Sequence, residues 1–150
     1  MDTFDKETAA RVWARVQRRE GPGEMPAVRA RPDELVWQSH TLAGLYLGLG
    51  KRAAGKTGQQ LGQLYQRHRQ LTACLRGLSR MNEGVLPGLP PMKAGDGPLP
   101  KQLEACYHRE LRLLEGLSQL AAEGNSPVYG LLSRQAAERC LTVLAMLGGG

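Results

Sequence analysis

Four polar side chains each interrupt a stripe of apolar residues that has helical spacing. They lie near the middles of the four stripes and are Ser39, His68, Glu110 and Arg139. Carboxylate and imidazole groups bind iron and other transition metals, whereas a guanidinium stays protonated and pairs with a carboxylate. Because polar groups in a dry core must have partners, the pattern predicts a binding site, the remains of one, or an internal ion pair.

A second candidate site is a glycine-rich stretch that matches the Walker A pattern G-x-x-x-x-G-K-[ST]. It begins at Gly50 and ends with Gly55, Lys56 and Thr57. In a P-loop, backbone N–H groups cradle phosphates, the lysine contacts the terminal phosphates and the hydroxyl binds Mg²⁺. That geometry needs a β-strand before the loop and further strands beside it, and no later segment supplies them. We therefore expect a turn between two helices, in which Lys56 and Thr57 begin the second helix. Nucleotide binding by this stretch is the alternative.

The apolar stripes predict an all-α chain. Their helices cover about 32–49, 57–81, 99–123 and 126–148, and short turns join the first to the second and the third to the fourth. The segment at about 82–98 is rich in proline and glycine and has no helical or strand period. About 16 extended residues reach ~50 Å, whereas a helix of about 24 residues is ~36 Å long. The segment can therefore cross the whole bundle, and two hairpins joined by one long crossover form the ferritin-like arrangement.

The organisation expected from these elements is one four-helix bundle preceded by a short extra helix. Residues 1–31 form the N-terminal helix, at about 4–19, and a linker, and residues 32–150 form the bundle. The N-terminal helix has a narrow apolar stripe at Ala9, Val12, Trp13 and Val16. A stripe of this width predicts packing on the bundle or on a partner chain, and it is small for a membrane-surface helix.

Composition excludes several classes of function. Lysine and arginine exceed aspartate and glutamate by 20 to 14, but they are scattered, and aromatic residues are only 5%, so a nucleic-acid surface is not expected. No apolar run approaches the ~18 residues of a membrane span, and the N-terminus has no secretory pattern. The three cysteines are widely separated, which is typical of reduced thiols in a cytoplasmic protein. His40 and His108 are expected to face solvent beside the apolar stripes, and no spacing indicates covalent catalysis.

The helix order, the crossover and the positions of the polar residues resemble a rubrerythrin-type, ferritin-like domain over about three quarters of the chain, roughly 33–147. In that family, a Glu from each of two helices and a Glu-x-x-His from each of the other two hold two iron ions. Here Ser39 stands where one Glu is expected, and His68-Arg69-Gln70-Leu71 and Ala136-Ala137-Glu138-Arg139 replace the two Glu-x-x-His motifs. Glu110 is the one ligand that the resemblance leaves in place.

The charges at these positions oppose a di-iron centre. Two iron ions carry at least four positive charges, which one Glu and one His do not balance, and Arg139 adds a permanent cation. The sequence therefore predicts that Arg139 takes the place of the metal charge and pairs with Glu110, while His68 and Ser39 complete the hydrogen bonds. The alternatives are that Arg139 extends to solvent from a differently phased helix, or that a single metal binds elsewhere.

The function expected from this reading is a non-catalytic binding or scaffolding protein of prokaryotic origin, without a cofactor or catalytic residues. Its expected partner is an unknown protein or a second copy of the chain, as a homodimer formed through the first helix, and not a membrane. The enzyme alternative is a peroxide-handling oxidoreductase of the di-iron type, with iron at an atypical site formed by Glu110 and His68.

Overall fold

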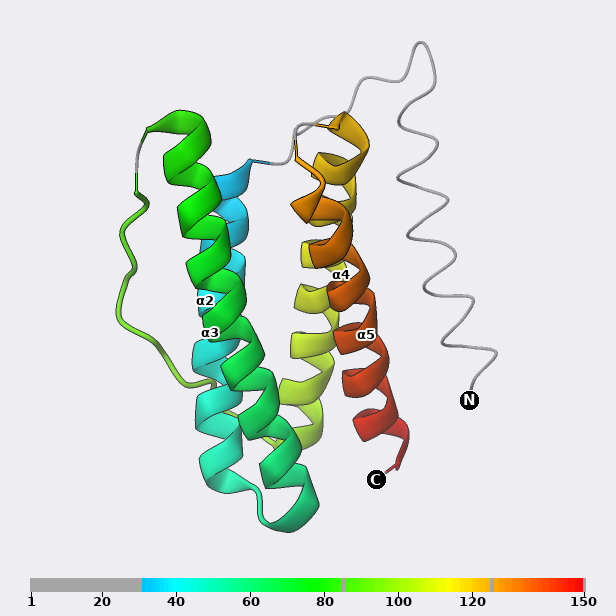
Figure 1. Cartoon of the computed structure of the whole chain (residues 1–150). Helices are drawn as coiled ribbons and strands as arrows, with labels where there is room; N and C mark the ends of the chain where they lie inside the picture. The colour runs from blue at the N-terminus through cyan, green and yellow to red at the C-terminus, as the bar shows by residue number, and fades with distance from the viewer. Residues whose placement is uncertain (1–30, 85, 125, 150) are drawn as a thin grey trace. The chain divides into compact units, whose positions relative to one another are not determined.

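The computed structural model describes residues 31–84, 86–124 and 126–149 of the chain. These residues form four helices and contain no strand (Figure 1). The helices are α2 (Pro32–Arg52), α3 (Gly55–Glu83), α4 (Leu99–Glu123) and α5 (Val128–Gly149). The prediction of an all-α chain is thus confirmed for the described part. The helix predicted at about 4–19 lies outside the described residues.

The chain divides into two compact units, and the division falls within α4. The first unit runs from Pro32 to Arg109 and holds α2, α3 and the beginning of α4. Of the described helices, the second unit holds α4 from Glu110 onward and all of α5. Each unit has its own buried apolar residues and its own buried polar cluster.

In the first unit, α2 and α3 form an antiparallel hairpin with a two-residue turn at 53–54. Acidic residues lie in the first turn of α2 and basic residues in its last turn, which suits the helix macrodipole. At the far end of α3, Gly84 adopts a left-handed conformation (φ 74°), and its N–H donates to the Arg80 carbonyl. Glycine meets this requirement without steric strain, so α3 ends there. The core of the hairpin includes Leu42, Tyr46, Leu61, Leu64 and Leu75.

The segment between α3 and α4, residues 86–98, is a crossover strap that lies along the hairpin (Figure 1). Arg76 Nε donates to the Pro87 carbonyl at 2.9 Å, and His40 Nε2 donates to the Pro90 carbonyl at 2.6 Å. Near the other end, Arg52 Nη2 donates to the carbonyl of Gly97 at 2.6 Å. The strap therefore carries the chain back to the end of the hairpin where α3 begins, and α4 starts from that end.

In the second unit, α4 and α5 are joined by a short turn. The N–H of Val128 donates to Ser126 Oγ at 3.3 Å, which is the helix cap that serine commonly provides. Further along, the hydroxyls of Ser118 and Ser133 lie 2.6 Å apart in a buried hydrogen bond between the two helices. The apolar core of this unit includes Leu113, Leu114, Leu117, Tyr129, Ala136 and Val143.

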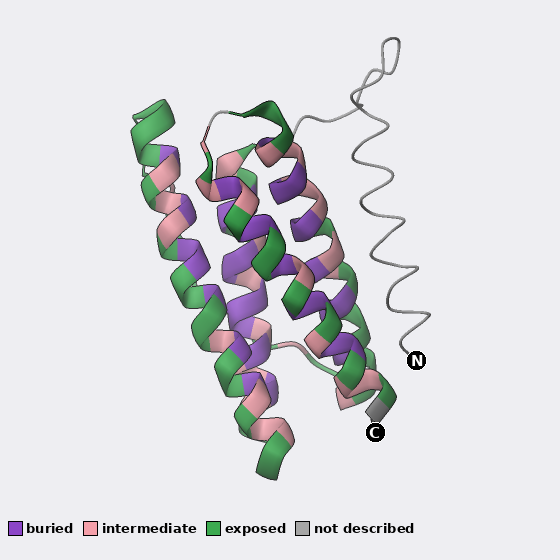
Figure 2. Cartoon of the chain, turned by 45° about the vertical axis from the view of Figure 1, so that its right-hand side comes forward, coloured by how far each residue is buried: buried purple, intermediate pink, exposed green. Residues whose placement is uncertain are grey.

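The helices are amphipathic rather than apolar all round. Figure 2 shows buried and exposed residues on opposite sides of the helical ribbons. This distribution is what the helical period of apolar residues predicts. None of the described helices combines the length and the hydropathy that a membrane crossing requires.

Candidate functional site

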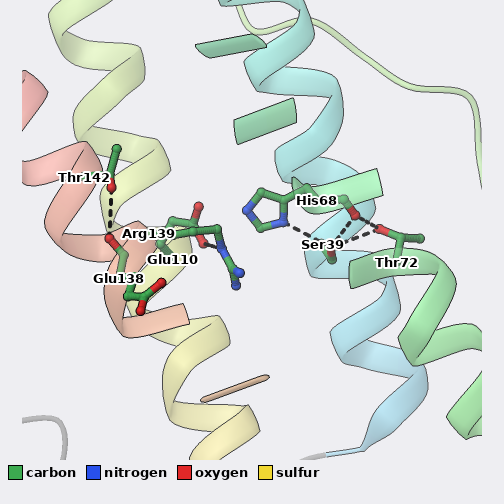
Figure 3. A network of polar contacts seen from close by, with 7 residues as sticks. All are labelled: Ser39, His68, Thr72, Glu110, Glu138, Arg139 and Thr142. Atoms are coloured by element: carbon green, nitrogen blue, oxygen red, sulfur yellow. Dashed lines mark hydrogen bonds and ion pairs between the residues drawn. The ribbon is translucent and has the colours of Figure 1, made fainter. Parts of the chain in front are cut away.

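The first buried polar cluster lies between α2 and α3. Ser39 Oγ is 3.1 Å from His68 Nδ1 and also donates to the His68 carbonyl at 3.1 Å (Figure 3). Thr72 Oγ1 is 2.9 Å from Ser39 Oγ and 2.7 Å from the same carbonyl. All three residues are buried. Two of the four predicted polar positions, Ser39 and His68, are thus brought into direct contact.

The imidazole of His68 is held by contacts from α2. Its Nδ1 shares a hydrogen bond with Ser39 Oγ, and the tautomer of the ring decides which of the two atoms donates. The ring of Tyr46 stacks on this imidazole with a centroid distance of 5.5 Å, which fixes its plane further.

The second buried cluster lies between α4 and α5. Arg139 Nε donates to Glu110 Oε1 at 3.2 Å, and the two side chains are 3% and 0% exposed (Figure 3). Nη2 of Arg139 is buried and has no hydrogen-bond partner among the described residues. The predicted pair of Glu110 and Arg139 is therefore present, and its guanidinium does not extend to solvent.

Cys140 follows Arg139 in the chain, and the charges of Glu110 and Arg139 both affect the pKa of its thiol. Burial, helped by the negative charge of Glu110 and opposed by the positive charge of Arg139, raises the pKa of Cys140 to about 12. A thiol with such a pKa is protonated at neutral pH and is a poor nucleophile. The cluster is thus an ion pair beside an inert thiol.

The other histidines belong to neither cluster. His108 is exposed and lies 3.9 Å from Glu104, one helical turn away on α4. His40 was expected to face solvent, and that expectation is wrong, since it is only 7% exposed. The crossover strap covers it and accepts its hydrogen bond through the Pro90 carbonyl. His40 therefore positions the strap.

The residues at the predicted ligand positions do not fit a di-iron centre. Ser39 contributes a neutral hydroxyl that is already hydrogen-bonded to the His68 backbone. Glu110 is engaged by a guanidinium, which cannot lose its proton to make room for a metal cation. In the described parts of the chain, no three His, Cys, Asp or Glu side chains are grouped so that they could hold a metal ion.

The Walker-like stretch lies at the turn between α2 and α3. Gly50 belongs to α2, while Gly55, Lys56 and Thr57 open α3, as the helix–helix prediction required. Gly58 is the residue that makes this turn tight, because a Cβ there would lie 2.7 Å from the Ala53 carbonyl oxygen. A P-loop follows a β-strand, whereas a helix precedes this stretch.

Comparisons with protein-family models, with curated proteins and with solved structures found no match to this chain. The resemblance to rubrerythrin-type proteins therefore stays a prediction that rests on the residues and on the order of the helices.

Thr72 and Tyr46 complete the His68 cluster, although neither is among the four polar positions that the sequence predicts for the site. A signal for Thr72 was present, because it lies four residues after His68 and thus on the same face of α3. Tyr46 was assigned to the apolar stripe alone, seven residues after Ser39, which is two helical turns.

Proposed function

We propose that this protein is a non-catalytic binding or scaffolding protein, built on a ferritin-like frame whose di-iron centre has been lost. The observation that carries the proposal is the buried pair of Glu110 and Arg139, at 3.2 Å. Glu110 is the ligand that the family pattern leaves in place, and Arg139 stands where that pattern has a histidine. A fixed cation at this position supplies the positive charge that a metal would otherwise give the carboxylate.

The ferritin-like frame is supported by the connections of the chain. The first hairpin is followed by a long strap that returns along it, and the last two helices are joined by a short turn. A single long crossover among four helices is the connectivity of the ferritin-like class. Without metal chemistry the frame would act through its surface, and scaffolding is the role that we propose for it.

Metal analysis of the purified protein tests this proposal. The protein is prepared without chelator, incubated with Fe(II) under anaerobic conditions, desalted and measured by mass spectrometry of its elements. We expect far less than one iron per chain. About two irons per chain, the content of an intact di-iron site, would overturn the proposal. About one metal per chain, lost in both Glu110→Ala and His68→Ala, would instead support the oxidoreductase alternative.

A further inference from the structure

The surplus of positive charge in this chain comes from one segment. Residues 35–82 include seven lysines and arginines and no aspartate or glutamate. The seven are Lys51, Arg52, Lys56, Arg67, Arg69, Arg76 and Arg80. The other 13 basic residues and all 14 acidic residues lie outside this segment, so the remainder of the chain is close to neutral. The basic residues are scattered through the chain, which predicts no nucleic-acid surface, but the acidic residues leave this segment uncompensated.

The structure does not neutralise these charges locally. Arg52 and Arg76 donate to backbone carbonyls of the crossover strap, and the other five side chains are exposed. The guanidinium of Arg69 lies over the ring of Tyr65, 5.8 Å from its centroid, which leaves its charge in place. No ion pair between described residues includes any of the seven. The segment therefore presents a positive potential to any ligand that approaches it.

Four glutamines lie along the exposed face of α3. They are Gln59, Gln63, Gln66 and Gln70, here called the glutamine row. Their spacing of four, three and four residues places them on one face of the helix, opposite the buried Leu61 and Leu75. The row extends over about 16 Å of helix. Beside it, Gly62 has no side chain, and a shallow hollow lies in this part of the face.

Exposed cations flank the glutamine row on both sides. At about 100° of rotation per residue, Lys56 and Arg67 lie to one side of the row, and Arg69 and Arg80 lie to the other. Uncharged amides therefore occupy the middle of the face, and positive charges occupy its two margins. A complementary ligand has hydrogen-bonding groups along its centre and negative charges along both edges.

We propose that this face of α3 binds double-stranded DNA, with the glutamine row in the major groove. The major groove is about 12 Å wide, admits an α-helix and is bordered by phosphates on both sides. Its base edges present the donors and acceptors that glutamine amides can pair with, while arginine and lysine contact phosphates. The length of the row corresponds to about five base pairs, at 3.4 Å for each.

Duplex DNA fits this face better than other polyanions do. Single-stranded nucleic acids stack their bases on aromatic rings, and Tyr65 is the one Phe, Tyr or Trp residue in α3. The major groove of an RNA duplex is too deep and narrow for side chains to read. An acidic protein segment would pair with the cations but would not need an uncharged row between them.

The inference goes beyond the proposed binding or scaffolding role and does not depend on the Glu110–Arg139 pair. The metal analysis and the DNA-binding test can therefore fail separately.

Titration of a fluorescein-labelled DNA duplex with the full chain tests the proposal. The duplex has a mixed sequence of about 20 base pairs, and anisotropy is measured at about 50 and 200 mM salt. Arg67→Ala/Arg80→Ala removes one cation from each margin of the glutamine row. The matched control is Arg112→Ala/Arg134→Ala, which removes two exposed arginines from α4 and α5.

A second pair of variants tests the row itself. Gln63→Glu places a negative charge within the row, and Gln135→Glu makes the same change at an exposed position of α5. Circular dichroism confirms that each variant keeps the helical content of the native chain. Because all the substituted side chains are exposed, we expect every variant to fold.

We expect saturable binding of the native chain at the lower salt concentration, with a Kd of roughly 10 µM or less, and weaker binding at the higher one. Arg67→Ala/Arg80→Ala should weaken binding at least tenfold and reduce the slope of log K against log salt by about 1.8, the value for two lost phosphate contacts. Gln63→Glu should weaken binding at least fivefold. Both controls should bind within about twofold of the native chain.

The proposal is overturned if the duplex does not bind saturably at the lower salt concentration, or if either variant loses no more affinity than its control. It is also overturned if single-stranded DNA or duplex RNA of the same sequence binds as tightly as duplex DNA. Displacement of the duplex by polyglutamate at an equal concentration of charges would overturn it as well, in favour of an acidic protein partner.

Discussion

Arg139 Nε and Glu110 Oε1 lie 3.2 Å apart, and neither side chain has appreciable access to solvent. Removing two opposite charges from water costs several kcal/mol per ion, and their attraction offsets this cost only while both are present. The pair therefore adds little net stability. Each charge can nevertheless stay buried only while its partner is present. This asymmetry between losing one charge and losing both can be measured.

Replacing Glu110 alone by leucine is expected to destabilise the protein by about 3–5 kcal/mol, because a buried guanidinium is left without its carboxylate. For a chain of this size, that corresponds to a decrease in Tm of roughly 10 °C or more. The double variant Glu110→Leu/Arg139→Leu is expected to be close to neutral, or stabilising, since it removes both desolvated charges. Urea denaturation of the two variants and the native protein gives the comparison.

The control for this experiment is Glu138→Leu, which removes a carboxylate from an exposed position next to Arg139. It should change the free energy of unfolding by less than about 0.5 kcal/mol, as substitutions at exposed positions usually do. An unchanged Tm for Glu110→Leu would mean that the guanidinium finds solvent, which contradicts a buried pair.

The thiol of Cys140 is expected to limit stability at high pH. Its pKa is about 12 in the folded protein, against an ordinary value of 9.0. Because the folded value is the higher one, the contribution of the thiol to stability is complete below about pH 9 and is lost as the pH rises toward 12. Denaturation measured between these limits should show a decline that Cys140→Ala makes less steep.

Thiol labelling provides an independent measurement of how accessible and how reactive the Cys140 thiol is. Cys74 is only partly buried, and burial raises its pKa as well, whereas Cys106 and Cys140 are buried. In the native protein Cys74 should react first with iodoacetamide, and Cys140 only on the timescale of unfolding. Labelling of Cys140 as fast as Cys74 at neutral pH would show that its thiol is neither buried nor protonated as described.

Magnesium and ATP together are expected to leave the Tm unchanged. Gly50 and Lys56 lie on two helices separated by a short turn, so their backbone lacks the strand–loop–helix geometry that surrounds a phosphate. A nucleotide present at about one hundred times its Kd would add about 2.7 kcal/mol of stability, a shift of roughly 5 °C or more. Such a shift, abolished by Lys56→Ala, would establish the nucleotide-binding alternative.

Elements with a regular period could be predicted from the sequence. The predicted fourth helix, 126–148, differs from α5 by two residues or fewer at either end, because proline and glycine delimit a clear helical pattern. The pairing of Glu110 with Arg139 could be predicted from the same helical period, since both residues lie on the apolar stripes of their helices. The structure also places Ser39 against His68, but the joining of all four residues into one layer stays a prediction.

The strap could not be predicted in this way. Its attachments are backbone carbonyls, which every residue has, so no residue type indicates which carbonyl accepts from Arg76 or from His40. The sequence predicts a solvent-facing His40 because the apolar stripe of α2 accounts for one face of the helix only. The strap covers a second face, and a segment without periodicity gives no sign of where it will lie.

Gly44 and Gly77 offer a paired test of how closely the strap is packed. Alanine is the better helix former by about 0.5–1 kcal/mol, so Gly77→Ala, on a face of α3 with nothing within 4 Å of the added Cβ, should stabilise the protein by that amount. At Gly44 the same Cβ would lie 2.9 Å from the Lys93 carbonyl oxygen and 3.3 Å from Met92 Cβ. The oxygen belongs to the backbone, so the strap itself must move, and we expect a net loss of about 1–3 kcal/mol.

Displacement of the strap should also make it easier for a protease to cleave. In Gly44→Ala, the bond after Lys93 should be cut by trypsin faster than in the native protein, while Gly77→Ala should leave the cleavage rate unchanged. Proteases need an extended segment that can leave its support, and the backbone contact at Gly44 prevents this in the native chain. If the two alanine variants were equally stabilised and equally resistant to cleavage, the strap would not lie against α2 at this position.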